Sequence, residues 1–476
     1  MRARSGSLCT ATGRWRSLAC AVTATIAGLL FLGSAAWAQS EETSEPAAAL
    51  RLIKIVPING TAASPNTKMY SFDISWVDPT TGLYFLADRS NAAVDVIDTK
   101  TDTLFGQIGG SAFNFGGDTG VNMPSNVAQG PNGVTVSPNS NVPCIFVTDG
   151  HSRVVSINYK VSFVQPASTF NTGGARRADE LAFDPKDNLL LVINNADTPA
   201  FATLINVSSS CVMNQPKTIF FTANNGALGA EQPVWDPGTQ RFYVSIPQIG
   251  SNPANGGVIK INPNGGAIEA VYPINFVSPA GLTLNPNTGD LLVGSNTVFD
   301  TSGKACTNVV PAPQGVNTTA PPAPLTCTGG IAAPQAAICN PRPGRDCTGD
   351  ALVAVPGIGG GDEIWFNSGD GNYYVTGSNN AVGPTFGVIA AVSGTKTNVL
   401  TQLVPTLPPV PANGTAGTAT YVHGSGTAHS IAACSQTPNG PCSINKVYLA
   451  LPANTDYSDS FGNTCTQGCV AVFSAQ

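Results

Sequence analysis

The sequence contains an internal repeat of about 50 residues, and this repeat constrains the fold more than any other feature. Each copy starts with a short β-prone run that ends in an Asp-Pro-like turn, and further β-prone runs follow. The seven copies start at 73–79, 132–138, 179–185, 231–237, 280–286, 362–368 and 429–435. Short strands between Gly, Asn and Pro turns, without a helical period, predict four-stranded antiparallel sheets.

Such a sheet cannot bury both of its faces alone, so successive sheets must pack against one another. We therefore predict an all-β fold, a seven-bladed β-propeller of four-stranded antiparallel blades. A β-sandwich is the structural alternative, but it does not account for the two chain ends. Residues 50–58 form a lone strand before the first copy, and 469–473 form a third strand with no fourth after it. We expect the N-terminal strand to complete the last blade and close the ring.

The first 38 residues have the features of a secretory signal peptide. Four arginines precede or flank the start of an apolar stretch at 18–32, and Ala36-Trp37-Ala38 supplies a small-residue cleavage pattern. An uncleaved anchor is the alternative, but the stretch is shorter than the ~20 residues of a membrane span. We predict a signal peptide over 1–38, a flexible segment over 39–49 and the propeller over 50–476. The mature protein is then a periplasmic or secreted monomer without membrane insertion.

Charge and cysteine content restrict the partners and the compartment. Loss of residues 1–38 removes four arginines and no acidic residue, so the formal net charge falls from −6 to −10. Such a chain lacks the basic surface that binds nucleic acid or anionic lipid. Ten cysteines remain, which predicts up to five disulfides in an oxidising compartment. The expected pairs are 144–211, 306–327, 339–347, 434–442 and 465–469. A Cys- and Pro-rich insertion over 300–350 interrupts the fifth copy.

Polar residues recur six positions before the turn proline or the residue that replaces it. In a propeller this position begins the innermost strand, where the blades converge on the central channel. Six of the seven residues there are polar, and Ala280 is the exception: Asp73, Asn132, Asp179, Glu231, Asp362 and His429. The next position adds Glu180, Gln232 and Glu363. Asp149, at the end of a second strand, is expected on the same face.

Clustered carboxylates repel one another unless a cation neutralises them, and their oxygen atoms suit calcium or magnesium. We predict a divalent-cation site at the axis. The candidate ligands are Asp73, Asn132, Asp149, Asp179, Glu180, Glu231, Asp362 and Glu363. The alternative is a water-filled channel whose polar residues are solvated. His429 is either a general acid or base, or a channel-lining histidine hydrogen-bonded to a neighbour.

Three tryptophans recur in the predicted inner strands, two or three positions before the turn: Trp76, Trp235 and Trp365. We interpret them as core residues that pack between blades.

The second copy resembles a known repeat. Residues 132–138 (Asn-Gly-Val-Thr-Val-Ser-Pro) and 145–149 (Ile-Phe-Val-Thr-Asp) resemble the repeats of YVTN-type and NHL-type propellers and of the SMP-30/gluconolactonase-like group. The last resemblance implies a cation held by Glu180, Asn132 and Asp149 that polarises an ester carbonyl and activates water. Glu180 and His429 are then the candidate catalytic residues.

The predicted function is the binding of a ligand or partner protein on the channel face. The alternative is a calcium-dependent lactonase or ester hydrolase.

Overall fold

The structure is a computed structural model. It describes residues 50–61, 68–118, 128–299, 302–303, 335–338, 353–355, 361–377, 388–394, 400–405, 429–436, 441–453 and 457–475. The predicted signal peptide and the segment 39–49 lie outside these residues. So do the four cysteines of the predicted pairs 306–327 and 339–347.

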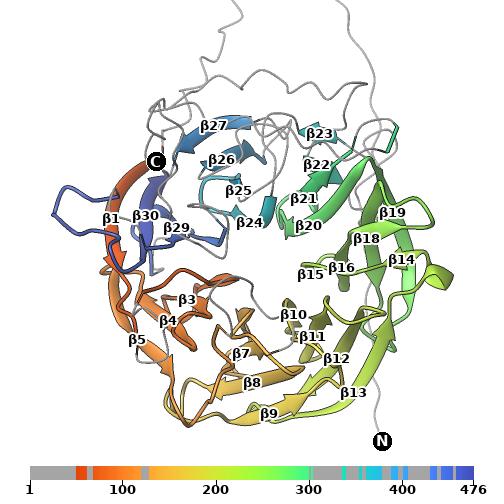
Figure 1. Cartoon of the computed structure of the whole chain (residues 1–476), viewed down its shortest axis with the longest axis horizontal. Coiled ribbons are helices and arrows are strands. Elements are labelled where there is room, and N and C mark those ends of the chain that lie inside the picture. Colours follow the sequence, from red (N-terminus) through yellow and green to blue (C-terminus); the bar gives the residue numbers. More distant parts are fainter. Residues whose placement is uncertain are drawn as a thin grey trace, which may run out of the picture. The chain divides into compact units, whose positions relative to one another are not determined.

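Residues 46–476 form one compact unit, in which the sheets follow one another around a common axis (Figure 1). The first sheet comprises β2 (Ser75–Asp78), β3 (Leu83–Asp88), β4 (Ala93–Asp98) and β5 (Thr103–Gly109). The second comprises β6 (Val134–Val136), β7 (Cys144–Asp149), β8 (Arg153–Asn158) and β9 (Ser168–Asn171). The third comprises β10 (Leu181–Asp184), β11 (Leu189–Asn194), β12 (Phe201–Val207) and β13 (Met213–Phe220).

The fourth and fifth repeats lie in a single eight-stranded sheet. Its first half comprises β15 (Pro233–Asp236), β16 (Arg241–Ile246), β18 (Asn255–Ile261) and β19 (Ile268–Asn275). Its second half comprises β20 (Val277–Leu284), β21 (Leu291–Val298), β22 (Gln335–Ile338) and β23 (Val353–Val355). The chain passes from β19 to β20 through one residue, Phe276, so β18 and β20 lie close enough to form the parallel pair Asn255–Val277.

The large sheets of the described chain therefore number six, whereas the sequence predicted seven separate blades. The difference arises from the one pair that joins the two halves of the eight-stranded sheet. Strand β22 lies inside the predicted insertion over 300–350, so part of that segment belongs to the sheet. A short pair, β14 (Ala227–Leu228) with β17 (Gln248–Ile249), and one 3-10 turn, η1 (Ala223–Asn225), complete this region.

The remaining two sheets contain four strands each. One comprises β24 (Gly361–Asn367), β25 (Asn372–Gly377), β26 (Val388–Ser393) and β27 (Leu400–Pro405). The other comprises β28 (Ile431–Cys434), β29 (Asn445–Leu451), β30 (Cys469–Ala475) and β1 (Arg51–Pro57). Strand β1 pairs antiparallel with β30, from Arg51 opposite Ser474 to Pro57 opposite Cys469 (Figure 1). The prediction that the N-terminal strand completes the last sheet is thus confirmed.

The Asp-Pro-like turn of the repeat has a local physical cause. The carboxylate of Asp78 accepts a hydrogen bond from the backbone N–H of Thr80 at 3.1 Å. Asp236 accepts one from the N–H of Gly238 at 2.8 Å, so the same Asx-type turn follows two different inner strands. Asparagine replaces aspartate in the fifth copy, where Asn285 accepts from the N–H of Asn287 at 3.0 Å.

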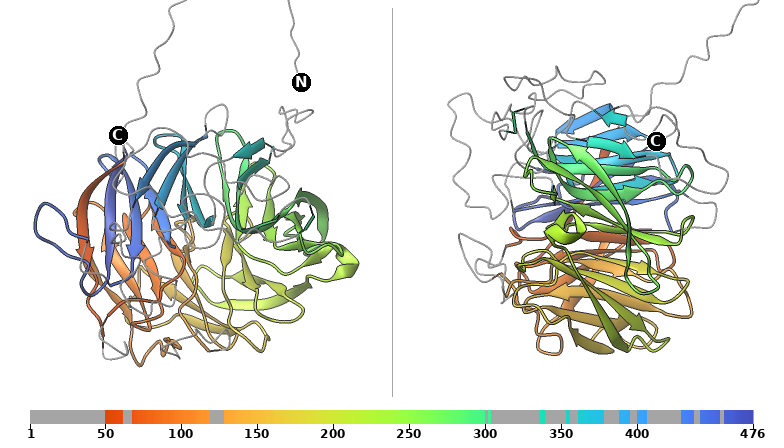
Figure 2. Two further views of the ribbon diagram at one scale, coloured as in Figure 1. Left: turned by 45° about the horizontal axis from the view of Figure 1, so that its top comes forward. Right: turned by 90° about the vertical axis from the view of Figure 1, so that its right-hand side faces the viewer.

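The hydrophobic core lies between neighbouring sheets. Tyr84 of β3 stacks on Tyr448 of β29, with ring centroids 5.2 Å apart, and Phe146 of β7 stacks on Phe183 of β10 at 5.3 Å. Every residue of β3 is buried, whereas exposed side chains alternate along the outer strand β5. Figure 2 shows the sheets side by side around the ring, not as the two stacked layers of a sandwich. Each sheet thus buries its two faces against its neighbours, as a propeller requires.

Three of the predicted disulfides are confirmed, since Cys144 is bonded to Cys211, Cys434 to Cys442 and Cys465 to Cys469. No helix in the described part of the chain has the length and apolar character needed to cross a bilayer.

The closing strand can be tested at Ile55, which is buried in the core of the last sheet. We expect Ile55→Ala to lower the free energy of unfolding by about 2–5 kcal/mol, because it leaves a cavity where β1 meets that core. Urea denaturation measures the change. Arg51→Ala, at an exposed position of the same strand, is the control. Equal effects of the two substitutions would contradict a closing role for β1.

Candidate functional site

The inner strands begin close together at one end of the axis, where hydrogen bonds join them directly. The N–H of Ile74 donates to the carbonyl of Asn132 at 3.1 Å, which joins the first sheet to the second. The hydroxyl of Thr376 donates to the carbonyl of His429 at 3.0 Å. At Gly133 a Cβ atom would lie 2.4 Å from the carbonyl oxygen of Asp179, so only glycine permits this approach. The side chains at this end are therefore held in fixed positions.

Arg89 lies at the centre of the predicted polar ring. Its Nε donates to Oδ1 of Asn132 at 2.8 Å, and its Nη2 pairs with Asp73. The same Nη2 lies 3.8 Å from Oδ1 of Asp179. One guanidinium thus contacts residues from the first three inner strands. Burial lowers the pKa of Arg89 to about 9, which still leaves the group charged at neutral pH.

His429 lies between two carboxylates of this ring. Its Nε2 is 3.0 Å from Oδ1 of Asp73, and its Nδ1 is 3.5 Å from Oδ2 of Asp362. Burial is the main cause that lowers the pKa of the imidazole, and the nearby Arg89 and Arg177 act in the same direction. These contacts are those of a histidine hydrogen-bonded within the channel. A general acid or base role for His429 stays a prediction.

Three glutamates form the second part of the site. Burial, together with neighbouring acidic groups, raises the pKa values of Glu180 and Glu363 well above the usual range. The pKa of Glu231 rises to about 8 for the same reasons, although a hydrogen bond from Asn195 at 3.2 Å opposes the shift. Glu231 is thus mainly protonated at neutral pH, and in Glu180 and Glu363 the same causes favour the protonated form.

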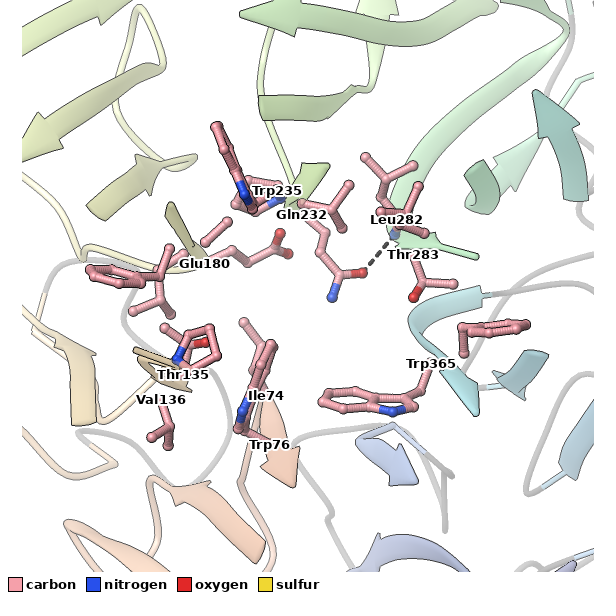
Figure 3. A pocket seen from close by; sticks show the side chains of 18 of the residues that line it. Ile74, Trp76, Thr135, Val136, Glu180, Gln232, Trp235, Leu282, Thr283 and Trp365 are labelled. Atoms are coloured by element: carbon pink, nitrogen blue, oxygen red, sulfur yellow. Dashed lines mark hydrogen bonds between the residues drawn. The ribbon is translucent and has the colours of Figure 1, made fainter. Parts of the chain in front are cut away.

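The polar ring adjoins an apolar channel of about 470 Å³ that is lined by the inner strands (Figure 3). Three tryptophans border this channel, Trp76, Trp235 and Trp365. Trp76 and Trp365 meet edge to face, with ring centroids 4.9 Å apart. The structure therefore corrects the expectation that these rings serve only as core between blades. The inner strands lie between the axis and the core, so their apolar side chains contact both.

In the close-up of the channel, the side chains of Glu180 and Gln232 extend into it from two different inner strands (Figure 3). The side-chain oxygen of Gln232 accepts a hydrogen bond from the N–H of Leu282 at 2.6 Å. Its nitrogen therefore faces the acidic groups and lies 3.5 Å from Oε2 of Glu363. Glu180 is 5% exposed, and its Oε2 has no hydrogen-bond partner among the described residues.

The structure brings together most of the predicted site residues, but not Asp149. The carboxylate of Asp149 accepts a hydrogen bond from the N–H of Gly116 at 3.0 Å and pairs with Arg153. Burial raises the pKa of Asp149, and the pair with Arg153 opposes this shift. Asp149 thus belongs to a separate ion pair beside the loop at Gly116.

No group of three or more His, Cys, Asp or Glu residues in the described ranges is arranged to hold a metal ion. The side-chain oxygen of Asn132, a ligand implied by the lactonase-like resemblance, already accepts the bond from Arg89. Calcium or magnesium binding therefore stays a prediction, as does hydrolase activity.

The sequence interpretation missed the two arginines of the site. Arg177 pairs with Asp179 at 2.7 Å and, together with Arg89, supplies positive charge that the prediction assigned to a metal. A signal was present, because Arg177 lies two residues before Asp179, and Arg89 follows directly after a second strand. We expected the end of a second strand, at Asp149, to lie on the channel face. The same expectation applied to the end of β3 would have pointed to Arg89.

Comparisons with known proteins support the fold alone. No protein-family model and no curated protein matches the chain. A structure of Kuenenia stuttgartiensis hydrazine synthase is similar, with 12% identity, a TM-score of 0.51, and coverage of 83% of this chain and 95% of that one. The Cps50 (Swd1) β-propeller domain of Myceliophteria thermophila has a TM-score of 0.49 and 6% identity, with 90% and 100% coverage. The chain is thus a β-propeller, while the YVTN, NHL and gluconolactonase-like resemblances stay predictions.

Arg89 can be tested by substitution. We expect Arg89→Met to lower the free energy of unfolding by about 3–5 kcal/mol, because it leaves Asp73 and Asp179 buried with less positive charge. Arg241→Met is the control, since its ion pair with Glu269 lies at the surface and should contribute less than about 1 kcal/mol. Chemical denaturation of both variants gives the comparison. A decrease in the free energy of unfolding no larger than that of Arg241→Met would show that the polar ring is stable without the Arg89 guanidinium.

The acidic residues predict a pH dependence of stability. The pKa of Glu231 is near 4.5 in the unfolded chain and about 8 in the folded one, so folding favours its protonated form. The stabilisation that comes from protonated Glu231 is complete at acidic pH and is lost as the pH rises through about 8. We expect the melting temperature to fall from pH 6 to pH 9, and to fall less steeply in Glu231→Gln.

Glu269→Gln is the matched control for this pH profile. The pair with Arg241 lowers the pKa of Glu269, which therefore stays ionised over the whole range. An unchanged pH slope in Glu231→Gln would contradict the raised pKa of Glu231.

Proposed function

We propose that this chain is a non-catalytic binding protein that takes a small amphipathic molecule into its axial channel. The observation that carries the proposal is an apolar channel of about 470 Å³ with glutamate and glutamine side chains at one end. This volume lies within the range of small-molecule sites, which combine apolar walls with a few polar groups. The fold itself is a scaffold that serves many functions, so the argument rests on the channel.

The wall of the channel favours an apolar ligand body. Side chains such as Ile74, Val136 and Leu282 face it from different sheets, together with the three tryptophans. A ligand that removes this apolar surface from water gains about 25 cal/mol for each Å² buried. Inner strands joined at their starts present these side chains in fixed positions, which lowers the entropy lost on binding.

We further propose that the eight-stranded sheet acts as two blades in this ring. Each half contributes its own inner strand to the channel, with Trp235 from β15 and Leu282 from β20. A single residue pair connects the halves, so each can pack on its neighbour as a separate four-stranded unit. The ring then has seven units, in accord with the seven copies of the repeat.

We also propose that the protein works in an oxidising compartment, the periplasm or the outside of the cell. Three disulfides among the described residues support this location, because such bonds persist where thiols are not kept reduced.

The tryptophans allow a direct test of channel binding. Beyond residue 38 the chain has no tryptophan other than Trp76, Trp235 and Trp365, so the indole fluorescence of the mature protein reports on the channel. We expect the neutral apolar probe N-phenyl-1-naphthylamine to bind with saturation and to change this fluorescence. Thr283→Trp, at a half-buried position of the wall, should lower the affinity at least tenfold by filling the channel.

Thr103→Trp is the matched control, because this threonine is exposed on the outer strand β5. Its affinity for the probe should stay within twofold of the parent protein. Equal binding by both variants would place the probe elsewhere and contradict the proposed site.

A further inference from the structure

We infer that the ligand of the axial channel carries a cationic nitrogen, as an alkyl- or arylalkylammonium group, and that Glu180 binds this nitrogen. The inference rests on the proposed function and specifies the chemical class of the ligand. Glu180 enters the channel from the start of β10 (Figure 3). It is 5% exposed, and its Oε2 lacks a hydrogen-bond partner among the described residues. A buried acceptor of this kind is costly unless a donor occupies the space beside it.

The charges around Glu180 favour a cation over an anion. Its acidic neighbours are Asp179, Glu231, Asp362 and Glu363. The charges of the two arginines nearby are already balanced by carboxylates, since Arg89 pairs with Asp73 and Arg177 pairs with Asp179, although Nε of Arg177 has no hydrogen-bond partner among the described residues. An anionic ligand would thus meet more carboxyl groups than guanidinium groups, whereas a cation would find an acceptor at Oε2 of Glu180.

The channel suits an organic cation better than a metal ion. Calcium needs six to eight oxygen ligands and magnesium needs six. The described residues contain no group of three acidic, histidine or cysteine side chains arranged for a metal. Gln232 offers its amide nitrogen here, because Leu282 occupies its oxygen at 2.6 Å. Indole rings and aliphatic side chains are poor metal ligands. The face of an indole ring attracts an ammonium group, and aliphatic side chains pack against the apolar body attached to that group.

The protonation of Glu180 gives the binding event a second signature. Burial and acidic neighbours raise the pKa of this carboxyl well above its usual range, which favours the protonated form while the channel holds no cation. An ammonium ion beside it favours the carboxylate. The proton then leaves to the buffer as the ammonium N–H donates to Oε2. Binding of the cation should therefore release protons, whereas binding of a neutral ligand should not.

The test uses three probes with the same apolar body: 4-phenylbutylamine, 4-phenylbutanol and 4-phenylbutanoate. Calorimetry of the mature protein at pH 7, in two buffers of different ionisation enthalpy, gives affinity and proton release together. We expect the amine to bind at least tenfold more tightly than the alcohol and to release protons. The carboxylate should bind most weakly.

Glu180→Gln keeps the shape of the side chain but removes its charge. We expect this variant to lose at least tenfold in affinity for the amine and to keep its affinity for the alcohol within twofold. Unchanged alcohol binding shows at the same time that the variant is folded. Glu269→Gln removes an exposed carboxylate and is the matched control, with both affinities unchanged.

Each other outcome counts against the inference in a distinguishable way. Equal affinity for amine and alcohol would overturn the cationic ligand but leave the apolar channel site in place. Failure of N-phenyl-1-naphthylamine and of all three probes to bind would overturn the proposed function as well. Displacement of the amine by millimolar calcium would assign the site to a metal ion. Tighter binding of Nα-acetyllysine amide than of 4-phenylbutylamine would assign it to a lysine side chain of a partner protein.

Discussion

The site depends on one buried guanidinium. Arg89 contacts Asp73, Asn132 and Asp179, which begin three consecutive inner strands. Each of these groups would lose hydration on burial, and the two carboxylates would also repel each other. A planar cation with five N–H donors offsets both costs at once. This contact explains how Asp73 and Asp179 can lie close together at one end of the axis.

The charge balance differs at the three glutamates of the site. Among the described residues no arginine forms an ion pair with Glu180, Glu231 or Glu363, and their raised pKa values follow from burial among acidic groups. The polar end of the channel is therefore divided in two. One part is neutralised by ion pairs and holds the inner strands in position. In the other part burial favours the protonated carboxyl groups, and Glu180 of this part faces the apolar channel.

Much of this arrangement was predictable from the repeat. The position six residues before the turn identified Asp73, Asp179 and His429, and the next position identified Glu180. Inner strands with the same register bring equivalent positions together, so a periodic pattern suffices to find them. Asp149 ends a second strand, and there its side chain pairs with Arg153 and accepts a hydrogen bond from the loop at Gly116. A rule for strand ends does not say which loop approaches them.

By itself the sequence determined the repeat, the turn chemistry, the closing strand and two short-range disulfides, because each depends on local pattern or on the repeat. The bond between Cys144 and Cys211, 67 residues apart, followed only as the pair that the short-range pairings left. Only the tertiary structure decided what neutralises the carboxylates and where the tryptophans face. Arg89 reaches Asp179 across 90 residues of chain, and no period of the sequence encodes that contact. The sequence likewise does not predict that the fourth and fifth repeats share one sheet. That depends on the one-residue connection at Phe276, which brings β18 and β20 close enough for Asn255 to pair with Val277.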